Sequence, residues 1–446
     1  MPRLRAEARP TRPRAASRTP PAKAAAENTT SHAPRAAAYY HGGMRYAFLV
    51  LVAAALQAQS LQFDFVSAKP APGFQKVLPG APYSEETGYG FESAATEPPL
   101  YFSVRVPVEG NYKVTVTLGD PAADSVTTIK AELRRLMLER VRVPAGKTET
   151  RSFIVNVRTP KIAGGGEVRL KDREKTSEVR AWDDRLTLEF TDSHPAVRTV
   201  VVEGAGDIPT IYVVGDSTST DQSGEPFNSW GQMLPRFFKP EVAVANHGES
   251  GESLRGFLGE RRWAKVLSLL KPGDYVLIQM GHNDQKEKGE GVGAFTTYKA
   301  DLKRFVADTR EHGATPVLVT SMNRLNFGDD GKIVSTLGDY PEAVRQAAQE
   351  EKATLIDLNA MSKTFYDALG QTDAHLAFAG SDKTHHDNYG SYELARCIVE
   401  GIRQAKLPVA KSLVDMPPFD PAHPDPVAKF DIPAEPARAA QRPYGQ

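Results

Sequence analysis

The feature that most constrains the fold is a regular alternation of segments that begins at residue 210. Short apolar runs occupy residues 210–215, 242–246, 274–281, 315–321 and 354–358. Amphipathic segments lie between or after them, at residues 229–238, 254–270, 298–313, 341–352 and 389–405. Nearly continuous apolar strands separated by helices are typical of a parallel sheet that is covered by helices on both faces. The sequence therefore predicts an α/β domain over residues 208–408.

The region before this domain, residues 61–207, has a different rhythm. Apolar and polar residues alternate there with a period of two, most clearly at residues 100–108, 111–120, 150–159, 185–192 and 197–205. Short strands separated by turns are typical of an antiparallel sandwich. We expect most of its aromatic side chains to form the core rather than a sugar-stacking surface; they are Phe63, Phe65, Tyr89, Phe91 and Trp182. Residues 409–446 form a Pro-rich tail that we expect to be extended or disordered.

The N-terminus carries an apolar segment at an unusual place. Residues 1–43 are rich in Pro, Arg and Ala and predict a disordered extension. Residues 44–60 have the basic start, short apolar run and small residues of a secretory signal peptide. We expect Met44 to be the true start, and the mature protein to be secreted or periplasmic. The alternative is a tail followed by a signal anchor, although the run is shorter than the roughly 20 residues of a membrane span.

Composition excludes some classes of function. Lys+Arg and Asp+Glu balance at 55 each, so there is no electrostatic case for a nucleic-acid partner. Cys397 is the single cysteine, so no intramolecular disulfide can form. Its helical, apolar neighbours predict a buried thiol without a chemical role.

Chemically active residue types follow the predicted strands. Ser217 comes directly after the first strand, Gly251 lies in the loop after the second, and Asn283 follows the third. Asp382 and His385 lie just before the last helix. In open parallel sheets ligands bind beyond the carboxyl ends of the strands, so these loops are expected to border one pocket.

These residues have the properties of an acyl-transfer site. A serine hydroxyl needs a base, and His385 could take the proton from Ser217 while Asp382 orients the imidazole. The backbone N–H groups of Ser217 and Gly251 and the side-chain amide of Asn283 could stabilise an oxyanion. His386 is the rival base, but the Asp-x-x-His spacing favours His385. A metal site at residues 385–387 lacks the usual ligand spacing. The alternative for Ser217 is a turn serine.

The four blocks "GDS", "GESGES", "GHND" and "DKTH", in this order, resemble the SGNH (GDSL-type) hydrolase family. The segments "GDST", "SWGQ", "GDYVLIQMGHND" and "YGSYELA" are most similar to rhamnogalacturonan acetylesterases. The resemblance implies a three-layer α/β/α fold with a five-stranded parallel sheet, preceded by a galactose-binding-like sandwich. It implies the catalytic triad Ser217, Asp382 and His385, and an oxyanion hole of Ser217, Gly251 and Asn283. It also implies deacetylation of pectic polysaccharide with no metal and no organic cofactor.

The residues that would contact a substrate are less defined by the sequence. Trp230, His247 and Arg255 are expected near the mouth of the pocket, where Arg255 could bind a galacturonate carboxylate or be an ordinary surface charge. His386 replaces an aromatic residue common in the family and could alter the rim. Two alternative functions remain: an esterase for another acyl group, such as a lipase, thioesterase or xylan acetylesterase, and a carbohydrate-binding protein with an idle hydrolase domain.

Overall fold

The computed structural model describes residues 60–93 and 97–434. The predicted extension of residues 1–43 and the predicted signal segment up to residue 59 lie outside the described residues. No helix in the described ranges is both long and apolar enough to cross a lipid bilayer.

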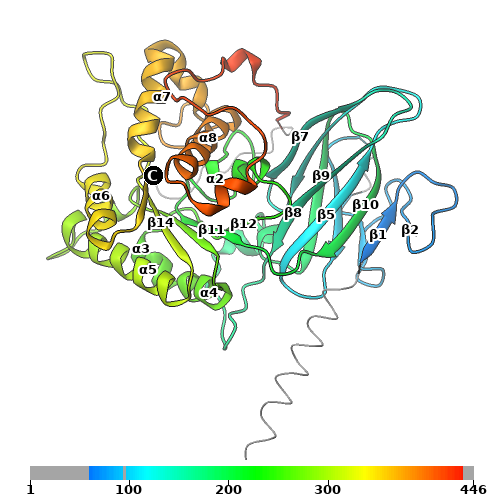
Figure 1. The fold of residues 1–446 in the computed structure, drawn as a ribbon, viewed down its shortest axis with the longest axis horizontal. Coiled ribbons are helices and arrows are strands. Elements are labelled where there is room, and N and C mark those ends of the chain that lie inside the picture. Colours follow the sequence, from blue (N-terminus) through cyan, green and yellow to red (C-terminus); the bar gives the residue numbers. More distant parts are fainter. Residues whose placement is uncertain (1–59, 94–96, 435–446) are drawn as a thin grey trace, which may run out of the picture. The chain divides into compact units, whose positions relative to one another are not determined.

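The N-terminal part is a sandwich of two sheets (Figure 1). One sheet has the strand order β2 (Gln75–Lys76), β1 (Leu61–Asp64), β10 (Val197–Gly204), β5 (Gly110–Leu118) and β8 (Glu149–Val157). The other has the order β3 (Tyr89–Phe91), β4 (Leu100–Arg105), β9 (Arg185–His194), β6 (Ser125–Ala131) and β7 (Arg135–Val143). All pairings are antiparallel except that of β1 with β2.

The sandwich core follows from the alternation in its strands. In β5, Val114, Val116 and Leu118 are fully buried, while the residues between them are partly exposed. Side chains from both sheets form one apolar cluster, which includes Phe63 and Phe102 in edge contact, with ring centroids 5.2 Å apart. The predicted sandwich is confirmed. Trp182 is the exception among the predicted core aromatics, because it belongs to a separate small cluster outside this core.

The second part contains a five-stranded parallel sheet. Its strand order is β12 (Ala243–Asn246), β11 (Thr210–Gly215), β13 (Tyr275–Gln279), β14 (Thr315–Val319) and β15 (Thr354–Ile356). All four pairings are parallel. The chain runs from β11 to β12 on one side and then crosses to β13 on the other side of β11. The strand order thus reverses beside β11, and the carboxyl end of this strand is where such sheets bind ligands.

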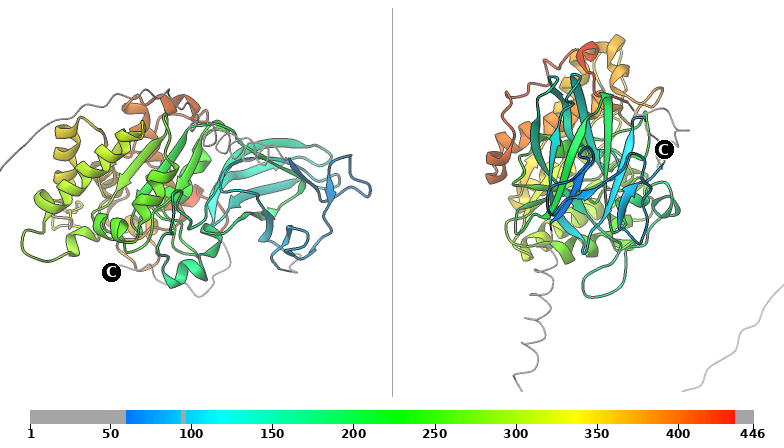
Figure 2. Two further views of the ribbon diagram at one scale, coloured as in Figure 1. Left: turned by 90° about the horizontal axis from the view of Figure 1, so that it is seen from below. Right: turned by 90° about the vertical axis from the view of Figure 1, so that its right-hand side faces the viewer.

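Helices cover both faces of this sheet (Figures 1 and 2). Ile211 and Val213 of β11 pack toward one face, against α2 (Trp230–Met233), α7 (Leu358–Asp373) and α8 (Asn388–Gln404). Tyr212 and Val214 pack toward the other, against α3 (Leu254–Gly259), α4 (Arg262–Leu269), α5 (Lys299–Glu311) and α6 (Tyr340–Glu351). The predicted three-layer α/β/α fold is confirmed.

Two details of the helical layers differ from the sequence prediction. The segment 254–270 is not one helix but two, because Arg261 adopts a left-handed conformation (φ 64°) that separates α3 from α4. Helix α7 was not among the predicted segments. Its N-terminus is capped by the Asp357 side chain, which accepts a hydrogen bond from the Ala360 N–H at 3.2 Å.

The Pro-rich tail is ordered over the part that the structure describes. Its apolar residues explain this, because Phe419 and Ile432 are buried in the core of the α/β part. Phe430 packs edge-on against Tyr389 and Tyr392 of α8. Residues 409–434 are therefore extended but packed, and residues 435–446 lie outside the described part.

Candidate active site

Ser217 lies in the turn that follows β11. The strand is buried along its whole length and ends at Gly215, where a Cβ atom would lie 2.1 Å from the Ser219 hydroxyl oxygen. The same Cβ would lie 2.7 Å from the Gln279 backbone carbonyl oxygen of β13, so a glycine is needed for this close approach. The Asp216 carboxylate accepts hydrogen bonds from the Thr218 N–H at 3.0 Å and the Thr218 hydroxyl at 2.7 Å. Asp216 therefore holds the turn that carries Ser217.

The side chains of Ser217, His385 and Asp382 form a continuous hydrogen-bonded chain. His385 Nε2 lies 2.8 Å from Ser217 Oγ, and His385 Nδ1 lies 3.1 Å from Asp382 Oδ2. Because an ionised carboxylate only accepts hydrogen bonds, Nδ1 carries the proton and Nε2 is left to accept from the serine hydroxyl. This is the arrangement a serine nucleophile requires, and the structure brings together the three residues predicted for it.

The surroundings of Asp382 keep it ionised. Burial would raise its pKa, but hydrogen bonds from the His385 side chain and backbone and from the Thr384 N–H hold the pKa well below its ordinary value. Its Oδ1 atom accepts the Thr384 N–H at 2.7 Å and the His385 N–H at 2.9 Å. Asp382 can therefore fix the tautomer of His385 and stabilise its protonated form.

The rival histidine points elsewhere. His386 Nε2 is 2.7 Å from the Tyr366 hydroxyl, and its ring packs on the rings of Tyr366 and Phe378. Burial, with a contribution from nearby His385, lowers the pKa of His386 to about 3. Asp387 turns away again to cap α8, accepting the Gly390 N–H at 2.8 Å. The three consecutive side chains at 385–387 diverge and do not converge on a metal position.

The predicted oxyanion donors lie on loops that are fastened to the Ser217 turn. The Glu249 N–H donates to the Gly215 carbonyl at 2.9 Å, which ties the loop containing Gly251 to the end of β11. Asn283 Nδ2 donates one hydrogen bond to the Glu252 carbonyl at 2.9 Å, which leaves its second amide hydrogen for another acceptor. Gly251 has a φ of +83°, a conformation that favours glycine.

The N–H groups of Ser217 and Gly251 are available for an incoming oxygen. Neither donates a hydrogen bond to any group within residues 60–93 and 97–434. Ser217 carries the attacking hydroxyl, and Gly251 lies in the loop whose Glu252 carbonyl accepts a hydrogen bond from Asn283. Orphan N–H groups at such a position are the donors that an oxyanion hole needs.

The predictions for substrate contacts are corrected by the structure. Trp230 is fully buried, and its Nε1 donates to Gln279 Oε1 at 2.8 Å, so it is a core residue of α2. His386 is likewise part of the interior, because its ring is stacked within an aromatic cluster. His247 is buried between Trp182 and Tyr212.

Arg255 lies on the surface of α3 with about half of its side chain exposed. Its Nε is 3.7 Å from a Glu287 oxygen and 3.9 Å from an Asp301 oxygen. Two carboxylates already compensate its charge, which favours the surface-charge interpretation over a contact with a substrate carboxylate. Cys397 is buried and free, as the sequence predicted.

Asp284, in the block "GHND", is a buried carboxyl group whose replacement should stabilise the protein. Burial, reinforced by the neighbouring Asp216 charge, raises the pKa of Asp284 to about 8. Since this lies above the ordinary value of 3.8, its neutral form is favoured by folding, and stability is lost as the pH rises from about 4 toward 8. Asp284→Asn keeps an acceptor for the Leu254 N–H, now 2.9 Å from Oδ1.

We expect the Asn variant to gain on the order of 2 kcal/mol in free energy of unfolding at pH 8. The gain should shrink at pH 5, where the native carboxyl group is already neutral. Urea unfolding of both proteins at the two pH values measures this difference. An equal difference at pH 5 and pH 8 would contradict the assignment of a raised pKa.

Comparison with known proteins agrees with this geometry. The model of the GDSL-like lipase/acylhydrolase family matches residues 213–394, which include the Ser217 turn and the Asp382–His385 pair. The rhamnogalacturonan acetylesterase RhgT of Bacillus subtilis is 36% identical over 219 residues, covering 46% of this chain and 94% of the relative. The probable rhamnogalacturonan acetylesterase YesY of the same organism is 35% identical over 216 residues, with coverage of 46% and 97%.

A third relative extends beyond the α/β part. The uncharacterized esterase YxiM of Bacillus subtilis is 26% identical over 370 residues, covering 78% of this chain and 92% of the relative. The identity to RhgT over nearly its whole length, together with the matched family model, establishes the relationship. The chain belongs to the GDSL-like lipase/acylhydrolase family and is a carboxylic ester hydrolase.

Proposed function

We propose that this enzyme removes acetyl groups from a pectic polysaccharide of the rhamnogalacturonan type, outside the cytoplasm. The hydrogen-bonded chain from Ser217 through His385 to Asp382 is the observation that carries the chemistry. The names of the relatives RhgT and YesY support the acetyl group and the glycan. The signal-like segment at residues 44–60 supports export.

The first half of the reaction acylates Ser217. His385 Nε2 takes the hydroxyl proton as Oγ attacks the acetyl carbonyl, and Asp382 stabilises the imidazolium that forms. The carbonyl oxygen becomes an oxyanion, which accepts hydrogen bonds from the N–H groups of Ser217 and Gly251 and the amide of Asn283. The carbon–oxygen bond to the sugar then breaks, and His385 gives its proton to the departing sugar oxygen.

The second half releases the acetyl group. A water molecule attacks the acetyl-serine carbonyl while His385 Nε2 takes one of its protons. The same donors stabilise the second oxyanion. When the bond to Ser217 Oγ breaks, His385 returns the proton to the serine, and acetate leaves. Over the cycle the ester and one water molecule become the free sugar hydroxyl and acetate, and Ser217 and His385 return to their starting protonation states.

Acetate release from a panel of acetylated polysaccharides tests the proposed substrate. We expect release from acetylated rhamnogalacturonan at least tenfold faster than from acetylxylan, and faster cleavage of 4-nitrophenyl acetate than of 4-nitrophenyl octanoate. Faster release from xylan would assign the enzyme to another glycan, and a preference for octanoate would favour a lipase. Glycan binding without acetate release would favour an idle hydrolase domain.

A further inference from the structure

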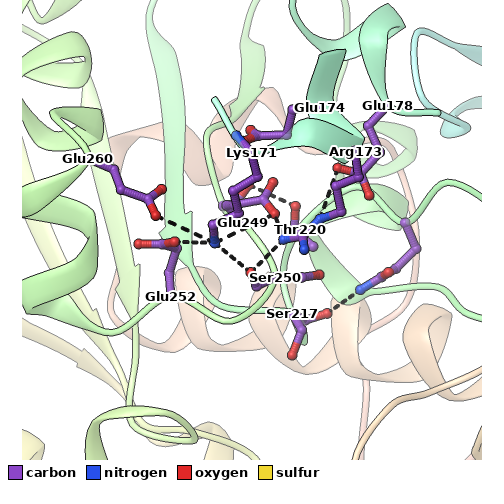
Figure 3. A network of polar contacts seen from close by, with 12 residues as sticks. Lys171, Arg173, Glu174, Glu178, Ser217, Thr220, Glu249, Ser250, Glu252 and Glu260 are labelled. Atoms are coloured by element: carbon purple, nitrogen blue, oxygen red, sulfur yellow. Dashed lines mark hydrogen bonds and ion pairs between the residues drawn. The ribbon is translucent and has the colours of Figure 1, made fainter. Parts of the chain in front are cut away.

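Two cations converge on the peptide bond that joins Ser250 to Gly251. Lys171 Nζ donates a hydrogen bond to the Ser250 carbonyl oxygen at 2.8 Å, and Arg173 Nη2 donates to the same oxygen at 2.7 Å. The N–H at the other end of this peptide group belongs to Gly251, the proposed oxyanion donor. Figure 3 shows Lys171 and Arg173 on one side of Ser250, with Ser217 on the other side in this view.

Carboxylates on both sides of the peptide are neutralised by the same cations. Glu249 forms an ion pair with Arg173, and Glu252 forms one with Lys171. Both glutamates are buried. Unpaired negative charges next to an oxyanion would oppose its formation, since charges interact strongly in a site that excludes water. Lys171 and Arg173 therefore also remove an electrostatic obstacle to the reaction.

We propose that Lys171 and Arg173 are positioning residues for the oxyanion hole, acting through the Ser250–Gly251 peptide group. Two charge-assisted hydrogen bonds to the Ser250 carbonyl fix the plane of this group and so the direction of the Gly251 N–H. They also polarise the amide, which strengthens the N–H as a donor. Fixing is needed because a glycine leaves the peptide more freedom to rotate than other residues do.

Both residues come from outside the segment that the family model matches. They lie at the 3₁₀ turn η1 (Asp172–Lys175), in the chain between β8 and β9 of the sandwich, whereas the match begins at residue 213. The turn is anchored by Glu174, which forms a buried ion pair with Arg262 at 2.6 Å. The N-terminal part of this chain thus completes a catalytic feature of the α/β part. The inference rests on the proposed mechanism, in which Gly251 donates to the oxyanion.

The test replaces each cation with methionine and follows 4-nitrophenyl acetate hydrolysis by the full chain. Because the oxyanion forms during the reaction and is absent from the bound substrate, kcat should fall about tenfold for Lys171→Met or Arg173→Met, with KM changed less than about threefold. The double variant should lose about 100-fold. Inhibition by methylboronic acid, which forms a tetrahedral anionic adduct with an activated serine, should weaken in parallel.

Two control variants separate positioning from folding. Lys175→Met removes an exposed cation of the same turn, whose partner is Asp172, and should leave kcat unchanged. Adding Glu252→Gln to Lys171→Met removes the carboxylate charge that Lys171 had neutralised. It does not restore the hydrogen bond that Lys171 donated to the Ser250 carbonyl. The inference predicts that this second change restores the melting temperature but recovers kcat only in part, because the hydrogen bond from Lys171 to the Ser250 carbonyl is still missing.

Three results would overturn the inference. They are an unchanged kcat in the double variant, full recovery of kcat by Glu252→Gln, and a loss of kcat without weaker boronic acid inhibition. Failure of the proposed function is distinguishable from these. A chain that hydrolyses 4-nitrophenyl acetate through Ser217 but releases no acetate from pectic glycan leaves the positioning role intact.

Discussion

Ser217→Ala is expected to reduce the rate of 4-nitrophenyl acetate hydrolysis by a factor of about 10⁴ to 10⁶. The hydroxyl is placed to attack, because His385 Nε2, the base that would take its proton, lies 2.8 Å from Ser217 Oγ. The turn itself should persist, since the Ser217 carbonyl still accepts the Gln222 side-chain amide at 2.6 Å. We therefore expect a melting temperature within a few degrees of that of the unaltered enzyme.

A matched control is available in α8. Ser391 is also fully buried, and its hydroxyl has no hydrogen-bond partner among the residues that the structure describes. Ser391→Ala makes the same chemical change at a serine that has no hydrogen bond to the triad, and it should leave the rate unchanged. Retention of more than a hundredth of the activity by Ser217→Ala would show that another group is the nucleophile. Loss of the folded state in that variant would be visible in its melting curve.

The fold was largely predictable because hydrophobic periodicity reflects burial. The strand β11 is buried on both faces of the sheet, and its sequence is an uninterrupted apolar run. The break at Arg261 was not predictable, because the apolar pattern of residues 254–270 continues across it. A non-glycine residue in the left-handed conformation, such as Arg261, does not change the spacing of apolar residues.

The candidate site was predictable where the strand ends determine position. Ser217 and Asn283 follow directly from the carboxyl ends of β11 and β13, and Asp382 and His385 share one loop. The direction in which a side chain points could not be predicted in the same way, because packing decides it. Trp230 follows the helix cap Ser229, and packing turned its ring inward to Gln279 instead of toward a pocket.

The positioning residues were beyond sequence reasoning for a further reason. Lys171 and the Ser250 carbonyl are 79 residues apart, and the contact depends on how the sandwich packs against the α/β part. The one sequence signal is the charge-dense run around residues 169–184, which is too polar and too long for a simple hairpin turn. Charge alone does not identify the partner.

Asp382→Asn is expected to lower kcat by about 10⁴-fold. An asparagine can donate an N–H to His385 Nδ1, which would move the imidazole proton to Nε2. A protonated Nε2 can no longer accept a hydrogen bond from the Ser217 hydroxyl. The acid in the same loop, Asp387, supplies the control. Asp387→Asn keeps the N-cap of α8, because asparagine caps helices as well as aspartate does, and should retain activity.

Asp382→Asn should also reveal the lowered pKa of Asp382 through the pH dependence of the free energy of unfolding. A carboxyl group whose folded pKa lies below its ordinary value of 3.8 stabilises the fold above that pH, and this contribution is lost as the pH falls toward the folded pKa. Asparagine has no such contribution at any pH. The difference in free energy of unfolding between the two proteins should therefore be constant from pH 7 to pH 5 and shrink below about pH 4. Chemical unfolding across this range measures it. A difference that stayed constant down to pH 3 would show that Asp382 gains nothing from its hydrogen bonds to His385 and Thr384, and the orienting role assigned to it would fail with them.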